Sequence, residues 1–515
     1  MKTAPYSSYF PEGSNKKTVA ALQSLVKQCA KAYKLTQKAF RFPTLRLSEE
    51  DRTRLAEILI DFALDIHSGS GLWTALEKYN TELFGTPLPL VHDGKAKLPT
   101  GICVERVQFL LWNMYPQIDR GRFLAPDHHD LLIAAEQVTE FLTESLPSLP
   151  DVSPVKKFLD MPKDYGWEIK RKLIWLGTKS YMFRLLFEEY IEEKHNGEIS
   201  IGIIDDFICQ NTSIWSGLGA NDILADCLDV PEAQREELRN WYLRHVALYE
   251  IIKTGKEHSE AINLINDAPY RIREGAPGHP RSAGIRQNMI LYGSLVPWRG
   301  EWYWSGECQN FTPLTARQRA DVIKNVRQKT QFVARYCKER EEKVFQFAEE
   351  QYQQSVKFYG NDLVVFPNGR AWQREEKKRF AAWAKAHGHA GHMPNMSWSE
   401  DLLESDNGIG IFSHPVEGQE IMEEFNEVRN GLKKDGKGCT GYEGEIIREW
   451  ICSTSINPHF IHRVLREYGG EESIKSAFCW STDASYWLDY LLRCRKGEYY
   501  RRRFPSIDIV DTKGN

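Results

Sequence analysis

Three histidines close together form the most metal-like group of the chain. His387, His389 and His392 lie in the segment HGHAGH, and His414 follows on a later predicted strand. Imidazole nitrogens are common ligands of zinc and other divalent ions, so these side chains could bind a metal if the intervening glycines let them converge. The spacing matches no standard zinc signature, however, and no cysteine or aspartate flanks the segment. A glycine-rich surface loop without a cofactor is therefore the alternative interpretation.

The segment 291–307 concentrates aromatic residues around a central Arg-Gly turn. Its sequence, LYGSLVPWRGEWYWSGE, has an aromatic run on each side of the turn, which predicts a β-hairpin. Side chains alternate along a strand, so Trp302 and Trp304 would share one face while Tyr303 takes the other. Such a face is either a large apolar core face or a recognition surface. The aromatic residues that we expect to contact a partner are Trp298, Trp302, Trp304, Tyr499 and Tyr500.

Basic residues gather near the C-terminus, in LLRCRKGEYYRRRFP, where a single glutamate opposes them. Arginine and aromatic side chains together can hold phosphates and stack on bases, which predicts a contact with nucleic acid or with an acidic protein. A basic helix end also complements its own carbonyl dipole, and acidic residues of the same chain could neutralise it. The candidate nucleic-acid-binding residues are Arg493, Arg495, Lys496, Arg501, Arg502 and Arg503.

Three further groups have simpler interpretations. The doublet His128-His129 with Asp130 stands where a helix should begin, so capping explains it better than metal binding does. The glycine-rich turn 407–410 leads into an apparent strand, which is the wrong context for a phosphate-binding loop. The carboxylate pair 205–206 could be given neither an acid nor a base role without a pocket.

Composition places the chain among ordinary globular proteins. Hydrophobic residues make up 42% of the 515 residues and charged residues 27%, so folding is expected throughout. The net charge of −4 provides no global attraction to nucleic acid or to an anionic membrane, so any such binding must be local. The N-terminal sequence lacks the apolar region of a secretory signal, no run of 18 apolar residues occurs, and the ten cysteines include no C-x-x-C pair. These features predict a cytoplasmic protein with free thiols.

Hydrophobic periodicity predicts an α+β protein that is predominantly helical. Apolar residues recur at helical spacing almost to residue 267, including a helix expected over 232–253, and the period then changes toward two. A second helix is expected over 417–434, after the strand GIGIFSH. The expected segments are a helical domain over 1–267, a small β module with the aromatic hairpin over 268–314, a long connecting helix over 315–360, an α/β domain over 361–440, and a helical C-terminal segment with a basic end over 441–515.

Four segments of the chain resemble those of a poorly characterised family of bacterial cytoplasmic proteins of unknown function. These segments are GLWTALEKYNTELFGTPLPL, the aromatic hairpin, NGIGIFSHPVEGQEIM and RKGEYYRRRFP. The resemblance implies no activity and no site residues. From the residues we expect a protein that binds a macromolecular partner, nucleic acid or an acidic protein, through aromatic and basic surfaces. The alternative is a metal-dependent hydrolase or nuclease-like enzyme that uses the three histidines of HGHAGH.

Overall fold

The computed structural model describes residues 10–11, 16–42, 46–119, 123–149, 153–264, 267–275, 284–311, 314–328, 338–388, 398–437, 441–481 and 483–505. They form two compact units. The first draws on Met1–Ile262, Pro269–Thr312 and Thr482–Glu498, and the second on Asn263–Ala268, Pro313–Ser481 and Tyr499–Asn515. Helices dominate and both units contain strands, so the predicted predominantly helical α+β class is confirmed.

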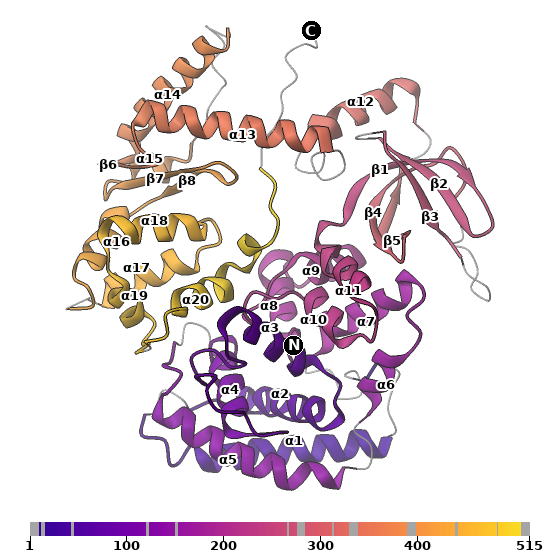
Figure 1. Ribbon diagram of the computed structural model, residues 1–515, viewed down its shortest axis with the longest axis vertical. Helices are drawn as coiled ribbons and strands as arrows, with labels where there is room; N and C mark the ends of the chain where they lie inside the picture. Colours follow the sequence, from indigo (N-terminus) through magenta and orange to yellow (C-terminus); the bar gives the residue numbers. More distant parts are fainter. Residues whose placement is uncertain are drawn as a thin grey trace. The chain divides into compact units, whose positions relative to one another are not determined.

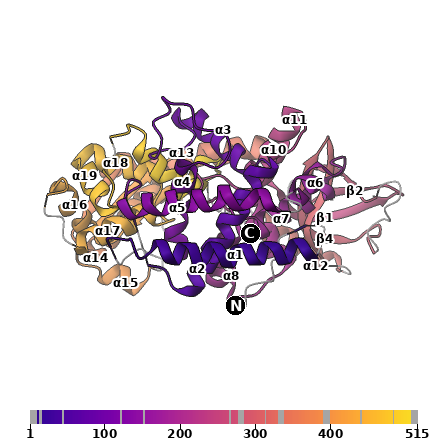
Figure 2. The same cartoon turned by 90° about the horizontal axis from the view of Figure 1, so that it is seen from below.

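The first unit begins as a bundle of helices (Figure 1). Helix α1 lies beside α2 and α5, and α4 lies beside α5 (Figure 2). The helices and short 3-10 turns of this unit are α1 (Lys16–Thr36), α2 (Glu49–Ser68), α3 (Leu72–Phe84), α4 (Val104–Ile118), α5 (His129–Ser145), η3 (Leu146–Ser148), α6 (Pro154–Asp160), α7 (Gly166–Lys179), α8 (Arg184–His195), α9 (Ile201–Gln210), α10 (Ala220–Cys227), α11 (Glu232–Arg239), η4 (Asn240–Leu243) and α20 (Trp487–Lys496), with η7 (Gly497–Tyr500) after it.

Local sequence signals account for several helix ends. The Ser48 hydroxyl accepts the Asp51 amide at the start of α2, and Gly69 ends this helix with a φ of 65°. That left-handed conformation is easily adopted by glycine because it has no Cβ. Asp130 is buried near the start of α5, where its carboxylate accepts the backbone amides of Arg41 and Phe42 at 2.9 and 2.8 Å. The side chain that caps α5 is His128, whose Nδ1 accepts the Asp130 amide at 3.2 Å, while Asp130 connects this helix to the segment after α1.

A closed five-stranded barrel completes the first unit (Figure 1). The strand order is β1-β2-β3-β5-β4, in which β3 runs parallel to β5 while β2 and β3, β4 and β5, and β1 and β4 are antiparallel. Arg299 and Gly300 both have positive φ, as a two-residue hairpin turn of type I′ requires, so the predicted hairpin is confirmed. The strands are β1 (His245–Thr254), β2 (His258–Asn263), β3 (Pro269–Arg273), β4 (Ile290–Trp298) and β5 (Glu301–Asn310).

The expected helix over 232–253 is wrong in its second half. Helix α11 ends at Arg239, and β1 begins at His245. The apolar residues of this segment fit a helical period, but from His245 onward the backbone pairs with β4, with His245 opposite Leu295 and Glu250 opposite Ile290. Strand pairing over this separation is decided by tertiary contacts, which override a weak local preference.

The second unit holds a three-stranded antiparallel sheet of order β6-β7-β8. Helices α13 and α16 pack on β7, and the buried residues Phe366, Trp372, Ile409 and Ile411 form a core cluster. Its elements are α12 (Ala316–Gln328), α13 (Lys338–Tyr359), β6 (Leu363–Phe366), α14 (Gly369–Ala386), α15 (Glu400–Glu404), β7 (Ile409–His414), β8 (Gly418–Met422), α16 (Phe425–Lys433), α17 (Gly441–Cys452), α18 (Pro458–Tyr468) and α19 (Glu471–Ala477).

Two of the expected helices in this half of the chain differ from the helices of the structure. The segment 417–434 is not one helix, because its first part, β8, pairs with β7 and only its second part forms α16. The expected long helix over 315–360 corresponds to α12 and α13, and residues 329–337 between them lie outside the described residues. The predicted strand GIGIFSH is confirmed as β7. None of the described helices combines the length and the apolar character that crossing a membrane would require.

Candidate functional site

Aromatic rings fill the inside of the barrel. The Trp302 ring lies 4.6 Å from His245 and 4.9 Å from Tyr270, and the Trp304 ring lies 5.6 Å from Tyr249. Strand β1 is not a neighbour of β3 or β5 in the sheet, so their rings meet through the interior. Trp302 and Trp304 are half-buried, and their main role is to fill the barrel core.

Trp298 is a core residue rather than a surface anchor. Its side chain has no exposed surface, its ring packs against Trp241, and its indole N–H donates to the Lys163 carbonyl at 2.9 Å. A side chain without exposed surface cannot contact a partner, which corrects the expectation for this residue. The sequence pattern could not separate the two outcomes because a buried and an exposed strand face carry the same aromatic alternation.

A buried ionic cluster fastens the barrel to the helices. The Asp205 carboxylate on α9 pairs with Lys170 of α7 and with Arg244, which precedes β1. It also accepts the hydroxyls of Ser294 on β4 and Ser305 on β5, at 3.0 and 2.7 Å. Burial alone would raise the pKa of Asp205, but the charges of Lys170 and Arg244 and the hydrogen bonds from Lys170 and Ser305 outweigh it and lower the pKa to about 2.

The composition of this cluster favours a structural role. Arg244 also pairs with Asp206, so two carboxylates face two cations. The nearby Cys209 is fully buried, and burial raises the pKa of its thiol to about 12. A thiol that stays protonated at neutral pH is a poor nucleophile. The cluster therefore binds the barrel to α7 and α9.

The outer face of β2 and β3 carries polar residues at every second position. His258 and Glu260 on β2 stand opposite Arg273 and Arg271 on β3. Arg271 is exposed, and its NH2 group lies 3.3 Å from His258 Nδ1. Among the described residues, no carboxylate forms an ion pair with Arg271, so its charge is not neutralised there.

Glu301 connects this face with β5. Its carboxylate accepts from His258 Nε2 at 2.8 Å, from Arg273 at 3.2 Å and from the Tyr303 hydroxyl at 3.1 Å. Burial raises the pKa of Glu301, but these three hydrogen bonds outweigh burial and lower it below the usual range. Arg273 also pairs with Glu257 at 3.3 Å.

Two aromatic rings border the same face. Tyr165 and Trp167, at the start of α7, stack with ring centroids 4.7 Å apart and an interplanar angle of 13°. The Arg273 guanidinium lies 5.5 Å from the Tyr165 ring centroid, and Trp167 meets Tyr303 edge-on. Both Tyr165 and Trp167 are partly exposed. The β2–β3 face therefore combines cations with partly exposed aromatic rings.

The sequence interpretation did not identify the residues of this face. The alternation of polar and apolar residues in HSEAIN and YRIR is the signal that could have identified them, because side chains two apart share one face of a strand. The partly exposed pair on α7 has no comparable signal, since only the fold places it beside β3. We call the set of outer residues on these strands, with the β1–β2 loop and the Arg299-Gly300 turn, the β2–β3 face.

The first half of the C-terminal basic group belongs to the first unit. Arg493 pairs with Asp489 at 2.8 Å, and the Arg495 guanidinium lies 5.2 Å from the Phe123 ring centroid. Lys496 is fully buried, so its assignment as a nucleic-acid contact is wrong.

The second half belongs to the second unit. Arg502 pairs with Glu341, and Arg503 forms a bidentate ion pair with Glu417 at 2.6 and 2.8 Å. The Tyr499 hydroxyl donates to the Thr454 carbonyl at 2.5 Å, and its ring lies under the Arg503 guanidinium. Tyr500 and Arg501 are partly exposed. The arginines are thus largely neutralised within the chain, which is the alternative that the net charge indicated.

The histidine cluster is only partly described. His387 is exposed and stacks on Trp383, whereas His389 and His392 lie outside the described residues. His414 stacks on His459 instead, and burial together with this neighbour lowers its pKa. Among the described residues, no three histidine, cysteine or acidic side chains lie close enough to hold a metal ion. Zinc binding by HGHAGH therefore stays a prediction.

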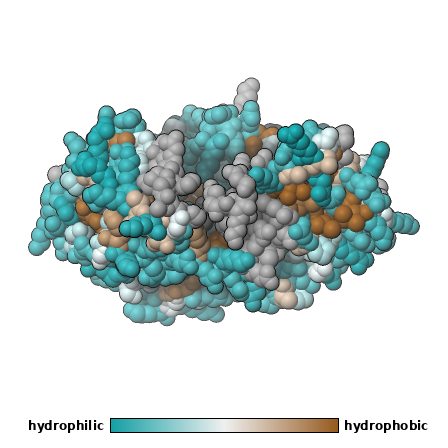
Figure 3. Space-filling view, turned by 90° about the horizontal axis from the view of Figure 1, so that it is seen from above, coloured by the Kyte–Doolittle hydropathy of each residue, from teal (hydrophilic) through white to brown (hydrophobic). Residues whose placement is uncertain are grey.

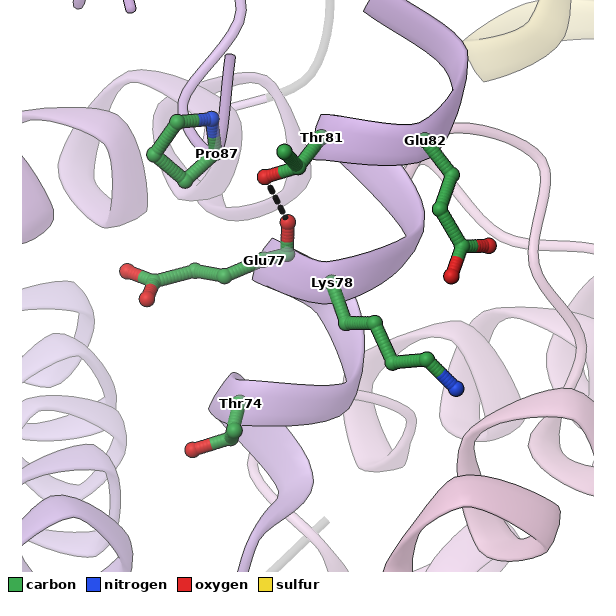
Figure 4. Close-up of a pocket in the computed structure, with 6 residues that line it drawn as sticks. All are labelled: Thr74, Glu77, Lys78, Thr81, Glu82 and Pro87. Atoms are coloured by element: carbon green, nitrogen blue, oxygen red, sulfur yellow. Dashed lines mark hydrogen bonds between the residues drawn. The ribbon is translucent and has the colours of Figure 1, made fainter. Parts of the chain in front are cut away.

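A shallow hollow lies along α3, lined by residues that include Glu77, Lys78 and Thr81 (Figure 4). The side chains of Glu77 and Lys78 point in different directions, and the Thr81 hydroxyl donates to the Glu77 carbonyl at 2.7 Å. Glu77 pairs with Arg106, and Lys78 pairs with Asp226. Because the charges do not converge and are already paired, we assign no chemistry to this hollow.

The barrel also exposes apolar side chains. Hydrophilic residues cover most of the face seen in Figure 3, with an apolar patch in its right half. The exposed large apolar residues of the barrel region are Ile252, Tyr292 and Phe311. Apolar patches of this kind occur at protein interfaces, but no charge pattern here distinguishes one partner from another.

Together these units define a class, a mainly helical protein that carries a five-stranded barrel. Residues 30–197 match a family described as protein of unknown function (DUF3843), which confirms the predicted resemblance to a family of unknown function. The matched range runs from within α1 to the end of α8 and does not reach the barrel. No curated protein and no solved structure matched the chain.

Proposed function

We propose that this protein binds single-stranded nucleic acid on the β2–β3 face. The observation that carries the proposal is the barrel's strand order, β1-β2-β3-β5-β4 with a parallel β3–β5 contact. This connectivity is that of the OB-fold, whose strands 2 and 3 and whose loops after strands 1 and 4 bind oligonucleotides and oligosaccharides. A fold alone does not establish a function, so the residues of the face must support the same conclusion.

The charges of the face support an anionic ligand. The face and its two loops hold four cationic residues in a chain whose net charge is −4. Arg273 pairs with Glu257 and Glu301, and Arg299 pairs with Asp164, so Lys256 and Arg271 are the two that no carboxylate among the described residues neutralises. Arginine suits phosphate because its planar guanidinium can donate two parallel hydrogen bonds. The four cationic residues are Lys256, Arg271, Arg273 and Arg299.

The aromatic pair of α7 supports a single-stranded ligand rather than a double-stranded one. Stacking on Tyr and Trp rings requires bases that are not enclosed in a double helix. Tyr165 and Trp167 lie partly exposed beside Arg273, so a base and its phosphate could be held next to each other. Arg502 and Arg503 of the C-terminus are a weaker candidate for binding phosphates, because a nucleic acid would first have to displace their partners Glu341 and Glu417.

Fluorescence anisotropy with a labelled thymidine oligonucleotide tests the proposal. We expect binding at about 20 mM salt that weakens as salt rises, with Arg271→Gln weakening it several-fold and reducing the log–log salt slope by about 0.7. Lys95→Gln is the matched control, because it removes one positive charge from an exposed site of the same unit. No binding at low salt would refute the proposal. Binding of poly-glutamate but not of the oligonucleotide would show that the partner is an acidic protein.

A further inference from the structure

His258 links the Arg271 guanidinium of the β2–β3 face to the partly exposed carboxylate of Glu301. The Glu301 carboxylate can only accept, so its contact of 2.8 Å with His258 Nε2 requires Nε2 to donate. Arg273 NH1, 3.5 Å from Nε2, donates to Glu301 instead, and Nδ1 of the neutral ring can accept from Arg271 at 3.3 Å. The proton of the neutral ring is therefore on Nε2, which donates to Glu301 Oε1 at 2.8 Å. In this state the neutral imidazole holds Arg271 against β2.

The charged groups around His258 come from three elements. Glu301 faces it from β5, and Arg271 and Arg273 face it from β3. Glu257, next to it in the chain, is engaged with Arg273. The His258 side chain is 15% exposed, so it can exchange protons with solvent.

We propose that His258 makes nucleic-acid binding on this face pH-dependent, because its neutral ring holds Arg271 and its protonated ring releases Arg271 to the phosphates. This inference rests on the proposed function and adds its regulation. A protonated Nδ1 carries a hydrogen and cannot accept from Arg271, so the contact becomes a repulsion between two cations. The guanidinium then turns toward solvent, where an anionic ligand can bind it.

The sign of the effect follows from charge. Protonation adds one positive charge to the face, and a phosphodiester strand compensates that charge. Affinity should therefore rise as the pH is lowered. By linkage, bound strand favours proton uptake to the same extent. One added charge at a partly exposed site should strengthen binding by about fivefold.

The test compares oligonucleotide affinity at about pH 6 and about pH 8 at constant ionic strength. The wild-type protein should bind about fivefold tighter at the lower pH. His258→Gln, which cannot titrate but keeps polar atoms toward Arg271 and Glu301, should bind with nearly the same affinity at both. Arg271→Gln should be weaker and should show a smaller affinity ratio than the wild type, because the charge of His258 is still gained but no guanidinium is released. Lys95→Gln should keep the wild-type ratio. Circular dichroism spectra establish that each variant is folded.

The outcomes separate the inference from the function on which it rests. An oligonucleotide that binds no variant at either pH refutes the proposed function. The role of His258 alone is refuted if the wild-type protein binds with equal affinity at the two pH values. It is also refuted if His258→Gln keeps the wild-type ratio of the two affinities. If His258→Gln does not fold, Arg271→Gln alone decides, because a pH dependence of affinity that is undiminished by loss of this guanidinium contradicts the mechanism.

Discussion

Replacing Asp205 by asparagine should destabilise the first unit strongly. The substitution keeps the size of the side chain but removes the negative charge that faces Lys170 and Arg244 at a site only 2% exposed. Arg244 keeps Asp206, but Lys170 loses its carboxylate. An uncompensated buried charge is costly, because water that would solvate it is excluded.

Two estimates give the magnitude. The fall of the Asp205 pKa from 3.8 to about 2 corresponds to about 2 kcal/mol, at about 1.4 kcal/mol for each pH unit. Loss of one partner from a buried ion pair typically costs about 3–5 kcal/mol. We therefore expect Asp205→Asn to lower the free energy of unfolding by about 3 kcal/mol.

Urea unfolding followed by tryptophan fluorescence and circular dichroism measures this change. With an m-value of about 3 kcal/mol per molar, the midpoint should move by about 1 M. Asp206→Asn is the matched control, since its carboxylate is 47% exposed and its loss should change the free energy by less than about 1 kcal/mol. Equal midpoints for Asp205→Asn and Asp206→Asn would refute the cluster as the link between barrel and helices.

The same carboxylate predicts a stability change in acid. Its folded pKa is lowered, so its contribution is complete above the unfolded value near 4 and is lost as pH falls toward about 2. Wild-type stability should therefore decline across this window more steeply than that of Asp205→Asn. Parallel curves for the two proteins would show that Asp205 is not the group responsible.

Two further substitutions test residues that the sequence placed on the surface. Trp298→Ala should lower the free energy of unfolding by about 3–5 kcal/mol, because it leaves a large cavity against Trp241; a change below about 1 kcal/mol in urea unfolding would contradict its burial. Arg503→Gln should leave oligonucleotide affinity within about twofold of wild type, because Glu417 already neutralises this guanidinium; a large loss measured by anisotropy would return the binding surface to the C-terminus.

Features set by neighbouring residues could be predicted from the sequence. The start of α2 at Ser48 depends on neighbouring residues alone, because a capping side chain acts within three residues. The hairpin around Arg299-Gly300 was identifiable because a two-residue turn sets the register of its strands. The mainly helical class followed from periodicity, which sums over many residues and tolerates local errors.

Features that depend on residues far apart in the sequence could not be predicted from the sequence. Strand β1 had a helical pattern and became a strand only through its pairing with β4. The composition of the aromatic hairpin did not reveal that Trp298 is buried or that Trp302 fills a barrel. Likewise, the run of C-terminal arginines gave no sign that Glu341 and Glu417, far away in the sequence, neutralise two of them.

The sequence by itself therefore determined which residues could bind charge or stack, and most of the helices that carry them. Only the tertiary structure decided which of those residues are exposed. Burial and ion pairing depend on residues brought together from several elements, as at Asp205, where α7, α9, β4 and β5 meet. For the same reason the candidate site moved from the basic C-terminus to Arg271 and His258, which become neighbours only when β2 pairs with β3.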